Sequence, residues 1–197
     1  MGRSKMRLFT TLLIVLAFIQ LQGCAYNAQQ AKLDPTIPIV KSDQGRNTSV
    51  LLQVVDERAT KSLGKRADTF GPAAQISASQ ELDDVIRTEV TKVLENKGFK
   101  VLRAGEGVGT TLKLEIRHFE YTMSQGWTFG LHVTGAIKAV TLRDEKAYEK
   151  LYRSSIEERV FVVPTAKINE EVINRGLSAL LSEMVKDEDL FKSLANP

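Results

Sequence analysis

Three long segments of alternating apolar and polar residues in the second half of the chain constrain its fold more than any other feature. Alternation puts every second side chain on one face, so each segment is predicted to be a β-strand. In the first segment, apolar residues occupy even positions up to Ile116 and odd positions from Phe119, which predicts a β-bulge at Arg117-His118. The turn sequences Ser124-Gln125-Gly126 and Asp144-Glu145 separate the segments. We therefore expect three antiparallel strands joined by short hairpins.

Two amphipathic segments are predicted to form helices on one face of this sheet. Residues 79–97 and 168–185 carry apolar side chains at three- and four-residue spacing, and Gly98 follows the first segment where a helix C′ glycine belongs. Shorter elements are expected as strands over residues 50–55, 73–78 and 99–102, and as a terminal helix over residues 187–194. The predicted fold class is α+β, an antiparallel sheet with two main helices packed on one face in a two-layer sandwich.

The first 23 residues have the layout of an export signal. Three basic residues, Arg3, Lys5 and Arg7, precede an apolar run from Leu8 to Ile19. As a helix this run spans about 18 Å, which is short of the hydrocarbon core of a membrane at about 30 Å. The length therefore argues against a permanent transmembrane helix.

The segment that follows, Leu21-Gln22-Gly23-Cys24, resembles the lipobox of bacterial lipoproteins. An aliphatic residue at the third position before the Cys and a small residue directly before it match, whereas Gln22 departs from the usual small or aliphatic residue. The resemblance implies cleavage after Gly23 and lipid attachment to the Cys24 thiol, with three acyl chains in the mature protein. An ordinary secretory signal cut near Ala25, which leaves a free thiol at Cys24, is the alternative.

The expected organisation has three parts. Residues 1–23 form a lipoprotein signal peptide, residues 24–48 a lipidated N-terminus with an extended tether, and residues 49–197 a single periplasmic α+β domain. Within the tether, Asp34-Pro35-Thr36-Ile37-Pro38 is expected to lie extended against the domain. An Asp after the lipidated Cys favours inner-membrane retention in enterobacterial-type sorting. Because Ala25 stands there, we expect an outer-membrane anchor, with the inner membrane as the alternative.

Composition excludes several classes of protein. Cys24 is the only Cys in 197 residues, so an intramolecular disulfide cannot form, and with two His in the chain we expect no structural zinc site. The net charge of +3 comes from 27 basic and 24 acidic residues, and loss of the three basic residues in the signal leaves 24 of each. We therefore expect no nucleic-acid partner. The Gly-rich residues 104–109 precede a predicted strand rather than a helix, so we expect no phosphate loop and no cofactor.

Several motifs, taken in order, make the chain similar to the YajG family of bacterial lipoproteins. They are Leu21-Gln22-Gly23-Cys24, Pro35-Thr36-Ile37-Pro38, Val54-Val55-Asp56-Glu57-Arg58 with Leu63-Gly64, Tyr121 with Ser124-Gln125-Gly126, and the last amphipathic helix. The resemblance covers nearly the whole chain. It implies an outer-membrane-type lipoprotein with a small periplasmic α+β domain, and it supplies no catalytic residue.

The two histidines are the first candidate site. If Gln125 is the centre of the hairpin, His118 and His132 lie opposite each other on adjacent strands, and with Glu115 or Glu120 they would make a weak metal site. Solvent-facing histidines, or histidines satisfied in the core, are the interpretation we favour. We therefore predict no metal.

Two further features have a structural and a functional interpretation. Asp56-Glu57-Arg58 end a predicted strand, where ligand sites often lie, but we expect a turn with a local ion pair. Trp127 stands at the start of a predicted strand, and we expect it in the core, with a membrane contact as the alternative.

No enzymatic activity is predicted, because no Ser can be placed beside a base and no carboxylate pair is placed for glycoside hydrolysis. The predicted function is that of a membrane-anchored, non-catalytic binding or accessory protein of the cell envelope, held by Cys24, with an envelope protein as partner. A periplasmic module that binds peptidoglycan, glycan or lipid is the alternative, which an aromatic groove near Tyr121, Trp127 and Tyr148 would favour. A third candidate function is that of a hydrolase with an unfamiliar active site.

Overall fold

The computed structural model describes residues 28–66, 73–102, 106, 109–143 and 146–195. The predicted signal peptide and Cys24 lie outside these residues, as do most of the Gly-rich residues 104–109 and the turn residues Asp144-Glu145.

The centre of the fold is the predicted meander. Strands β6 (Thr110–Gln125), β7 (Phe129–Arg143) and β8 (Lys146–Val160) pair antiparallel, and the register shifts between Ile116 and His118 as the change of phase predicts. Apolar side chains on both sides of this bulge are buried. The extra residue thus keeps one face of β6 in the core along its whole length.

The rest of the sheet corrects the predicted antiparallel arrangement. Strand β2 (Ser49–Asp56) is parallel to β6 on one side and to β5 (Lys100–Leu102) on the other. Beside the far end of β6 lie β3 (Gly64–Lys65), β4 (Gln75–Ala78) and β1 (Gln29–Ala31), of which β3 is parallel to β6, β4 is antiparallel to β3, and β1 is parallel to β4. The sheet is therefore mixed. Parallel neighbours need a long crossover, and helix α2 lies in the one between β2 and β6.

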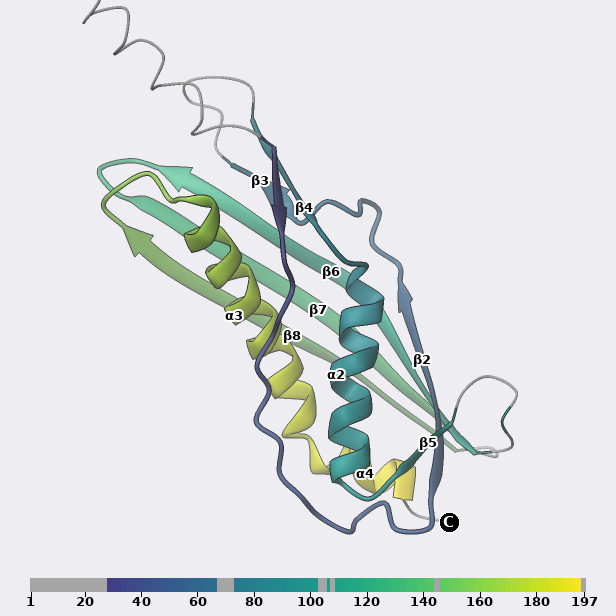
Figure 1. Cartoon of the computed structure of the whole chain (residues 1–197). Helices are drawn as coiled ribbons and strands as arrows, with labels where there is room; N and C mark the ends of the chain where they lie inside the picture. The colour runs from purple at the N-terminus through teal and green to yellow at the C-terminus, as the bar shows by residue number, and fades with distance from the viewer. Residues whose placement is uncertain (1–27, 67–72, 103–105, 107–108, 144–145, 196–197) are drawn as a thin grey trace, which may run out of the picture.

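The two main helices cover one face of this sheet, as predicted (Figure 1). Helix α2 (Leu82–Asn96) and helix α3 (Ala166–Val185) turn their apolar stripes to the sheet, and the short helix α4 (Glu188–Ala195) closes its lower end. Gly98 follows α2 with a φ of 87°, the left-handed conformation that suits glycine. Gly176 lets α3 approach the sheet closely, because a Cβ there would lie 2.3 Å from a Val133 methyl carbon.

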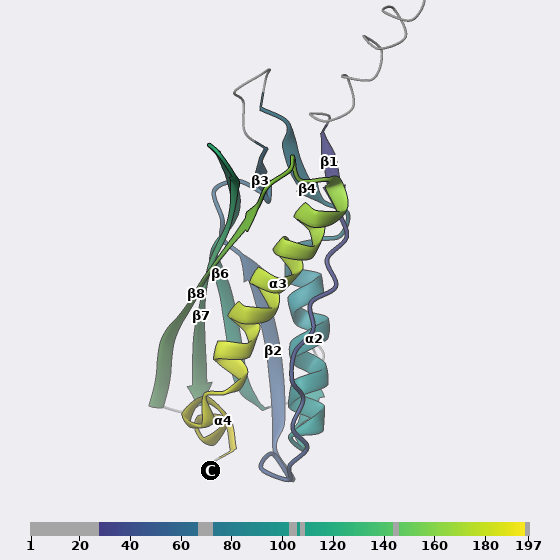
Figure 2. The ribbon, with the colours of Figure 1, turned by 90° about the vertical axis from the view of Figure 1, so that its left-hand side faces the viewer.

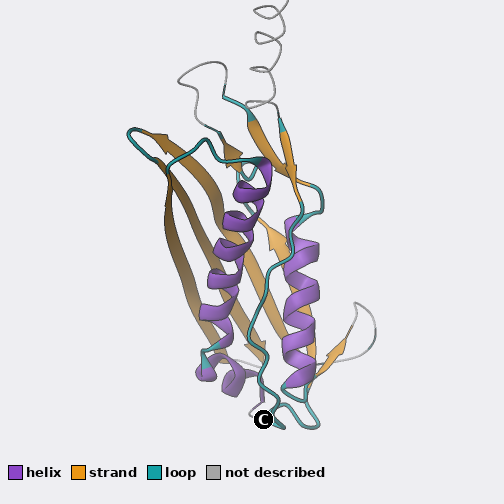
Figure 3. Cartoon of the chain, turned by 60° about the vertical axis from the view of Figure 1, so that its left-hand side comes forward, coloured by secondary structure: helices purple, strands orange, loops and turns teal. Residues whose placement is uncertain are grey.

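An extended segment, residues 29–38, begins in the sheet as β1 and then runs along helices α2 and α3 (Figures 2 and 3). We call these residues the N-terminal strap. Its buried apolar side chains are Ala31, Leu33 and Ile37. The expectation that residues 34–38 lie extended against the domain is confirmed, because the Asp34 and Thr36 N–H groups bond to α3 and Ile37 is buried. The contact with α3 begins earlier in the predicted tether, at Gln29.

Helix α3 holds the backbone of the strap with a ladder of polar side chains. Alternate strap N–H groups, those of Lys32, Asp34 and Thr36, donate to Glu170, Asn174 and Ser178 at 2.7, 2.7 and 2.8 Å. Two residues of an extended chain advance about 6.6 Å and four residues of a helix about 6 Å, so the two repeats stay in step. The strap is therefore fixed along its length.

Candidate binding groove

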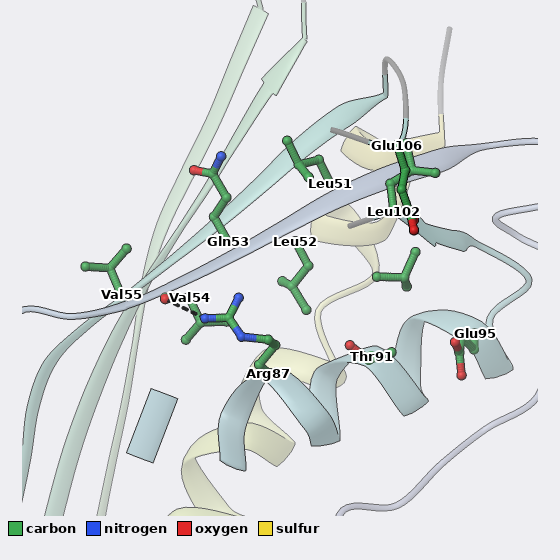
Figure 4. Close-up of a pocket in the computed structure, with 11 residues that line it drawn as sticks. Leu51, Leu52, Gln53, Val54, Val55, Arg87, Thr91, Glu95, Leu102 and Glu106 are labelled. Carbon is green, nitrogen blue, oxygen red and sulfur yellow. Dashed lines mark hydrogen bonds between the residues drawn. The ribbon is translucent and has the colours of Figure 1, made fainter. Parts of the chain in front are cut away.

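A groove of about 760 Å³ lies between β2, β5 and helix α2 (Figure 4). Aliphatic side chains make up more than half of its lining: Leu51, Leu52, Val54, Val55, Val101 and Leu102. The polar part of the lining consists of Gln53, Arg87, Thr91, Glu95 and Glu106. The groove is thus apolar along the strands, with polar side chains contributed mainly by the helix.

One wall of the groove is a partly open strand edge. Strand β5 pairs with β2 only at residues 49–51, whereas β6 pairs with residues 50–56 on the other side. Among the described residues, positions 52–56 of β2 therefore have no strand partner on the groove side. Arg87 Nη2 donates to the Val54 carbonyl oxygen at 3.1 Å, so part of this edge is occupied by a long, flexible side chain.

A second long edge of the sheet, that of β8, differs in chemistry. Strand β8 pairs with β7 alone and carries charged residues along its length: Lys146, Glu149, Lys150, Arg153, Glu157, Glu158 and Arg159. Charges on an edge strand oppose the addition of another strand. The open stretch of β2 reads Leu-Gln-Val-Val-Asp, with its only charge at the end. Of these two edges, β2 is the one suited to receive an extended chain.

The two histidines do not meet. His118 lies opposite Ala136 and His132 opposite Thr122, and His118 Nε2 contacts Thr134 Oγ1 at 2.8 Å. The hairpin turns over residues 126–128 rather than 124–126, so the predicted pairing across Gln125 is wrong. The described residues contain no group of three or more ligands that could hold a metal ion.

Asp56 and Arg58 form a buried ion pair in the turn after β2, with 2.8 Å between Oδ2 and Nη2. Arg58 also donates to the Phe119 carbonyl oxygen at 3.3 Å. Burial raises the pKa of Asp56, but hydrogen bonds from Arg58 and Lys61 outweigh it and leave that pKa below its usual range. The structural interpretation of this segment is thus confirmed.

The three aromatic residues that would favour a glycan groove lie apart. Tyr121 is fully buried and its hydroxyl donates to Asn169 Oδ1 at 2.8 Å. Trp127 is fully exposed in the β6–β7 loop, so the expectation that it lies in the core is wrong. Tyr148 lies toward the opposite end of the sheet, paired with Thr141. The turn is two residues later than predicted, and this moves Trp127 from the strand into the loop.

A cluster around Asp187 was not predicted. Its Oδ2 accepts hydrogen bonds from the hydroxyls of Tyr148 and Tyr152, both at 2.7 Å, and from Lys150 Nζ at 2.5 Å. Burial raises the pKa of Asp187, but these three donors together hold it well below its usual range. The two tyrosines share a strand face, which a sequence pattern reveals, but nothing in the sequence brings Asp187 to them. The cluster joins the end of α3 to β8.

The comparisons with known proteins identify the family. The sequence model of a family described as "Uncharacterized lipoprotein" (Lipoprotein_16) matches residues 35–195. The chain belongs to this family. It is the YajG family that the motifs indicate. No curated protein matches the chain in sequence.

Two solved structures resemble this lipoprotein. Protein XCC0632 from Xanthomonas campestris, of the DUF330 family, shares 14% identity over 80% of this chain and 93% of its own, with a TM-score of 0.56. A second, described as an uncharacterized protein, shares 14% identity over 80% of this chain and 100% of its own, with a TM-score of 0.45. At such identity the likeness to the first shows the fold alone.

Membership in a lipoprotein family implies a lipid anchor to a membrane. No described helix is long and apolar enough to cross a bilayer.

Proposed function

We propose that this lipoprotein is a non-catalytic accessory protein of the cell envelope, which binds an extended segment of an envelope protein in the groove beside β2. The observation that supports this most is the combination of a strand edge that lacks a strand partner over residues 52–56, contacted there by the side chains of Arg87 and Lys61, with an apolar groove next to it. An added strand would pair its backbone with residues 52–56 and place alternate side chains in the groove.

The chemistry of the groove supports binding rather than catalysis. Thr91 carries the only hydroxyl among the lining side chains, and neither a His nor a Cys is among them. The polar side chains at hand are those that orient a bound chain: Arg87, which already contacts the β2 backbone, and Glu95 on the same helix. An open stretch of five residues measures about 17 Å, which suits a short, exchangeable contact.

The proposed location follows from the N-terminus. Residues 1–23 act as the signal peptide, Cys24 carries the acyl chains, and Ala25 favours sorting to the outer membrane. The domain then faces the periplasm, where a protein partner would meet the groove.

A lipid ligand is the second candidate. Six of the eleven lining residues are aliphatic, which suits an acyl chain. No aromatic side chain lines the groove, which makes a glycan less suitable because sugars commonly stack on aromatic rings.

Photocrosslinking in living cells tests the proposal. A photoreactive residue replaces Gln53, which is exposed on the open edge, and in a matched strain it replaces Ser155, which is exposed on the charged edge strand β8. We expect a recurrent envelope protein, identified by mass spectrometry, at position 53 and not at position 155. The adduct should be lost with Thr91→Arg, which fills the groove from the helix.

The other outcomes are also decisive. A lipid adduct at position 53 that Thr91→Arg removes would replace the proposed partner with the second candidate. Equal adducts at positions 53 and 155, or none at either, would overturn the groove as a binding site.

A further inference from the structure

The end of the sheet at the β6–β7 loop carries large apolar side chains that nothing in the described structure covers. Trp127 is 103% exposed, Phe161 86% and Val162 66%, and Val163 follows at 40%. We call Trp127 and residues 161–163 the apolar tip. Contiguous exposed apolar residues in a soluble domain commonly mark a surface that contacts a membrane or another protein.

The two parts of the apolar tip lie side by side. Gln125 pairs with Phe129, and Phe129 pairs with Val160, so the loop after β6 and the segment after β8 leave the sheet at the same level. Figure 1 shows both at one end of the long strands.

The loop and the segment that carry the apolar tip contain no charged residue of their own. Neither residues 121–131 nor residues 160–166 contain an Asp, Glu, Lys or Arg, in a chain of which 26% is charged. The turn between β7 and β8, at the opposite end, reads Arg-Asp-Glu-Lys. Charged side chains flank the apolar tip rather than lie in it. Glu157 and Arg159 are exposed on β8 beside His132 and Gly130, and Arg66 Nη2 donates to the Pro164 carbonyl oxygen at 2.7 Å. An uncharged tip that contains a Trp suits the interfacial layer of a bilayer, because Trp is favoured there and charges are not.

The lipid anchor belongs at the same end. The strand register links Gln29 to Ile76, Ile76 to Gly64, and Gly64 to Tyr121, so Gln29 lies at the level of Tyr121. Tyr121 is four residues, about 13 Å, below the end of β6. Because β1 runs antiparallel to β6, the chain that leads back from Gln29 points toward the apolar tip.

The segment between Cys24 and Gln29 is short. Cys24 stands five residues before Gln29 and therefore lies at most about 18 Å from it. Gln29 itself is held, because its Nε2 donates to the Ala166 carbonyl oxygen at 2.7 Å and its Oε1 accepts from Asn169 Nδ2 at 3.0 Å. The domain therefore cannot stand clear of the membrane that holds the lipid.

We propose that the apolar tip rests in the interfacial layer of the bilayer to which Cys24 is anchored, with Trp127 and Phe161 among the lipid headgroups. The tip acts as a second membrane contact that fixes the orientation of the domain. This surface is separate from the groove, and the test below uses vesicles without any partner protein, so either proposal can fail alone.

Trp127 is the only Trp in the chain and serves as its own probe. The mature lipidated protein, with its mass confirmed, is reconstituted into phosphatidylethanolamine–phosphatidylglycerol vesicles, with and without bromine on the acyl chains. We expect emission shifted to shorter wavelength than for an exposed Trp and at least about twofold quenching by the brominated lipid, since an interfacial Trp lies near the acyl chains. Emission typical of water, with no quenching, would overturn the proposal.

The matched control moves the Trp to the far end of the sheet. Leu142 is 52% exposed and pairs with Thr111 at the start of β6. In the double variant Trp127→Phe and Leu142→Trp, we expect no quenching. Quenching as strong as in the parent protein would mean that the domain lies on its side, and would also refute the proposed orientation.

A second variant tests the tip as a unit. Phe161 and Val162 are exposed, so Phe161→Ser with Val162→Ser should leave the melting temperature nearly unchanged. We expect this variant to lose at least about half of the quenching of Trp127, because the neighbouring apolar contact with lipid is gone. Unchanged quenching would exclude residues 161–163 from the contact.

Discussion

The buried polar chain that ties the strap to the core gives the sharpest test of the fold. The Tyr121 hydroxyl donates to Asn169 Oδ1 at 2.8 Å, Asn169 Nδ2 donates to Gln29 Oε1 at 3.0 Å, and Gln29 donates on to the Ala166 carbonyl oxygen. Tyr121 and Asn169 are both fully buried. Water therefore cannot replace a partner that is removed.

Tyr121→Phe removes one oxygen and leaves Asn169 Oδ1 buried without this donor. Such an acceptor costs about 1–3 kcal/mol, and we expect a loss near 2 kcal/mol in the free energy of unfolding. For a domain of this size that loss lowers the melting temperature by about 4–8 °C. Urea unfolding of the chain from Ala25 onward, without the lipid, measures the free energy, and an unchanged m-value confirms that the unfolded state is the same.

A double-mutant cycle separates the hydrogen bond from the loss of packing. Asn169→Leu keeps the number and branching of the side-chain heavy atoms and leaves the Tyr121 hydroxyl buried without its acceptor. Together with Tyr121→Phe it removes both partners, so the double variant should be more stable than the sum of the single losses predicts, by about 1 kcal/mol or more. Strictly additive losses would refute the reasoning, since they would mean that the two groups do not depend on each other.

Three further perturbations follow from the contacts of the helices. Burial raises the pKa of Asp187, but the hydrogen bonds from Lys150, Tyr148 and Tyr152 lower it by more. The pKa in the folded protein therefore lies below the unfolded value. The stabilisation by Asp187 is complete above an unfolded pKa of about 3.9 and is lost as pH falls, so Asp187→Asn should flatten the decline in stability below pH 5. Asn174→Ala removes the acceptor of the Asp34 N–H, and hydrogen exchange at that amide should accelerate about tenfold for a loss of 1.4 kcal/mol. Gly176→Ala puts a Cβ against Val133 and should cost about 1–3 kcal/mol, measured by urea unfolding.

Each of these has a control within the chain. Asn174→Asp keeps an acceptor and should exchange more slowly than Asn174→Ala, and equal rates would contradict the ladder. Val133→Ala should restore part of the stability that Gly176→Ala loses, whereas a further loss would contradict the close contact. Acid unfolding of Asp187→Asn that parallels the parent protein would show that the pH dependence comes from other carboxylates.

The meander was predictable because its pattern is local. The change of phase between Ile116 and Phe119 located the bulge, and the predicted faces are the buried ones. The register was not predictable. A slip of one residue exchanges the faces of a strand, but a turn centred two residues later keeps every apolar side chain on the same face. The pattern therefore cannot separate a turn at Gln125 from one at Trp127.

The direction of pairing was not predictable either. The alternation in β2 shows which face is buried, but it carries no information on whether the neighbouring strand runs parallel. The groove could not be predicted either, because it exists only where the short strand β5 stops pairing with β2 at Leu51. The hydrogen bonds between α3 and the strap could not be predicted. The residues that accept them, Glu170, Asn174 and Ser178, have the spacing of an ordinary solvent-exposed stripe on a helix.

The long strands set the distance between the two proposed surfaces. At the groove, Leu52 pairs with Leu112, and β6 then continues for thirteen residues to Gln125, beside the apolar tip. That length is about 40 Å along the strand. A lipoprotein that rests on its tip therefore presents the open edge of β2 well beyond the headgroup layer, where a transmembrane or lipid-embedded segment cannot reach it. The partner that fits this geometry is a periplasmic segment of an envelope protein. A lipid ligand would have to leave the bilayer before it entered the groove.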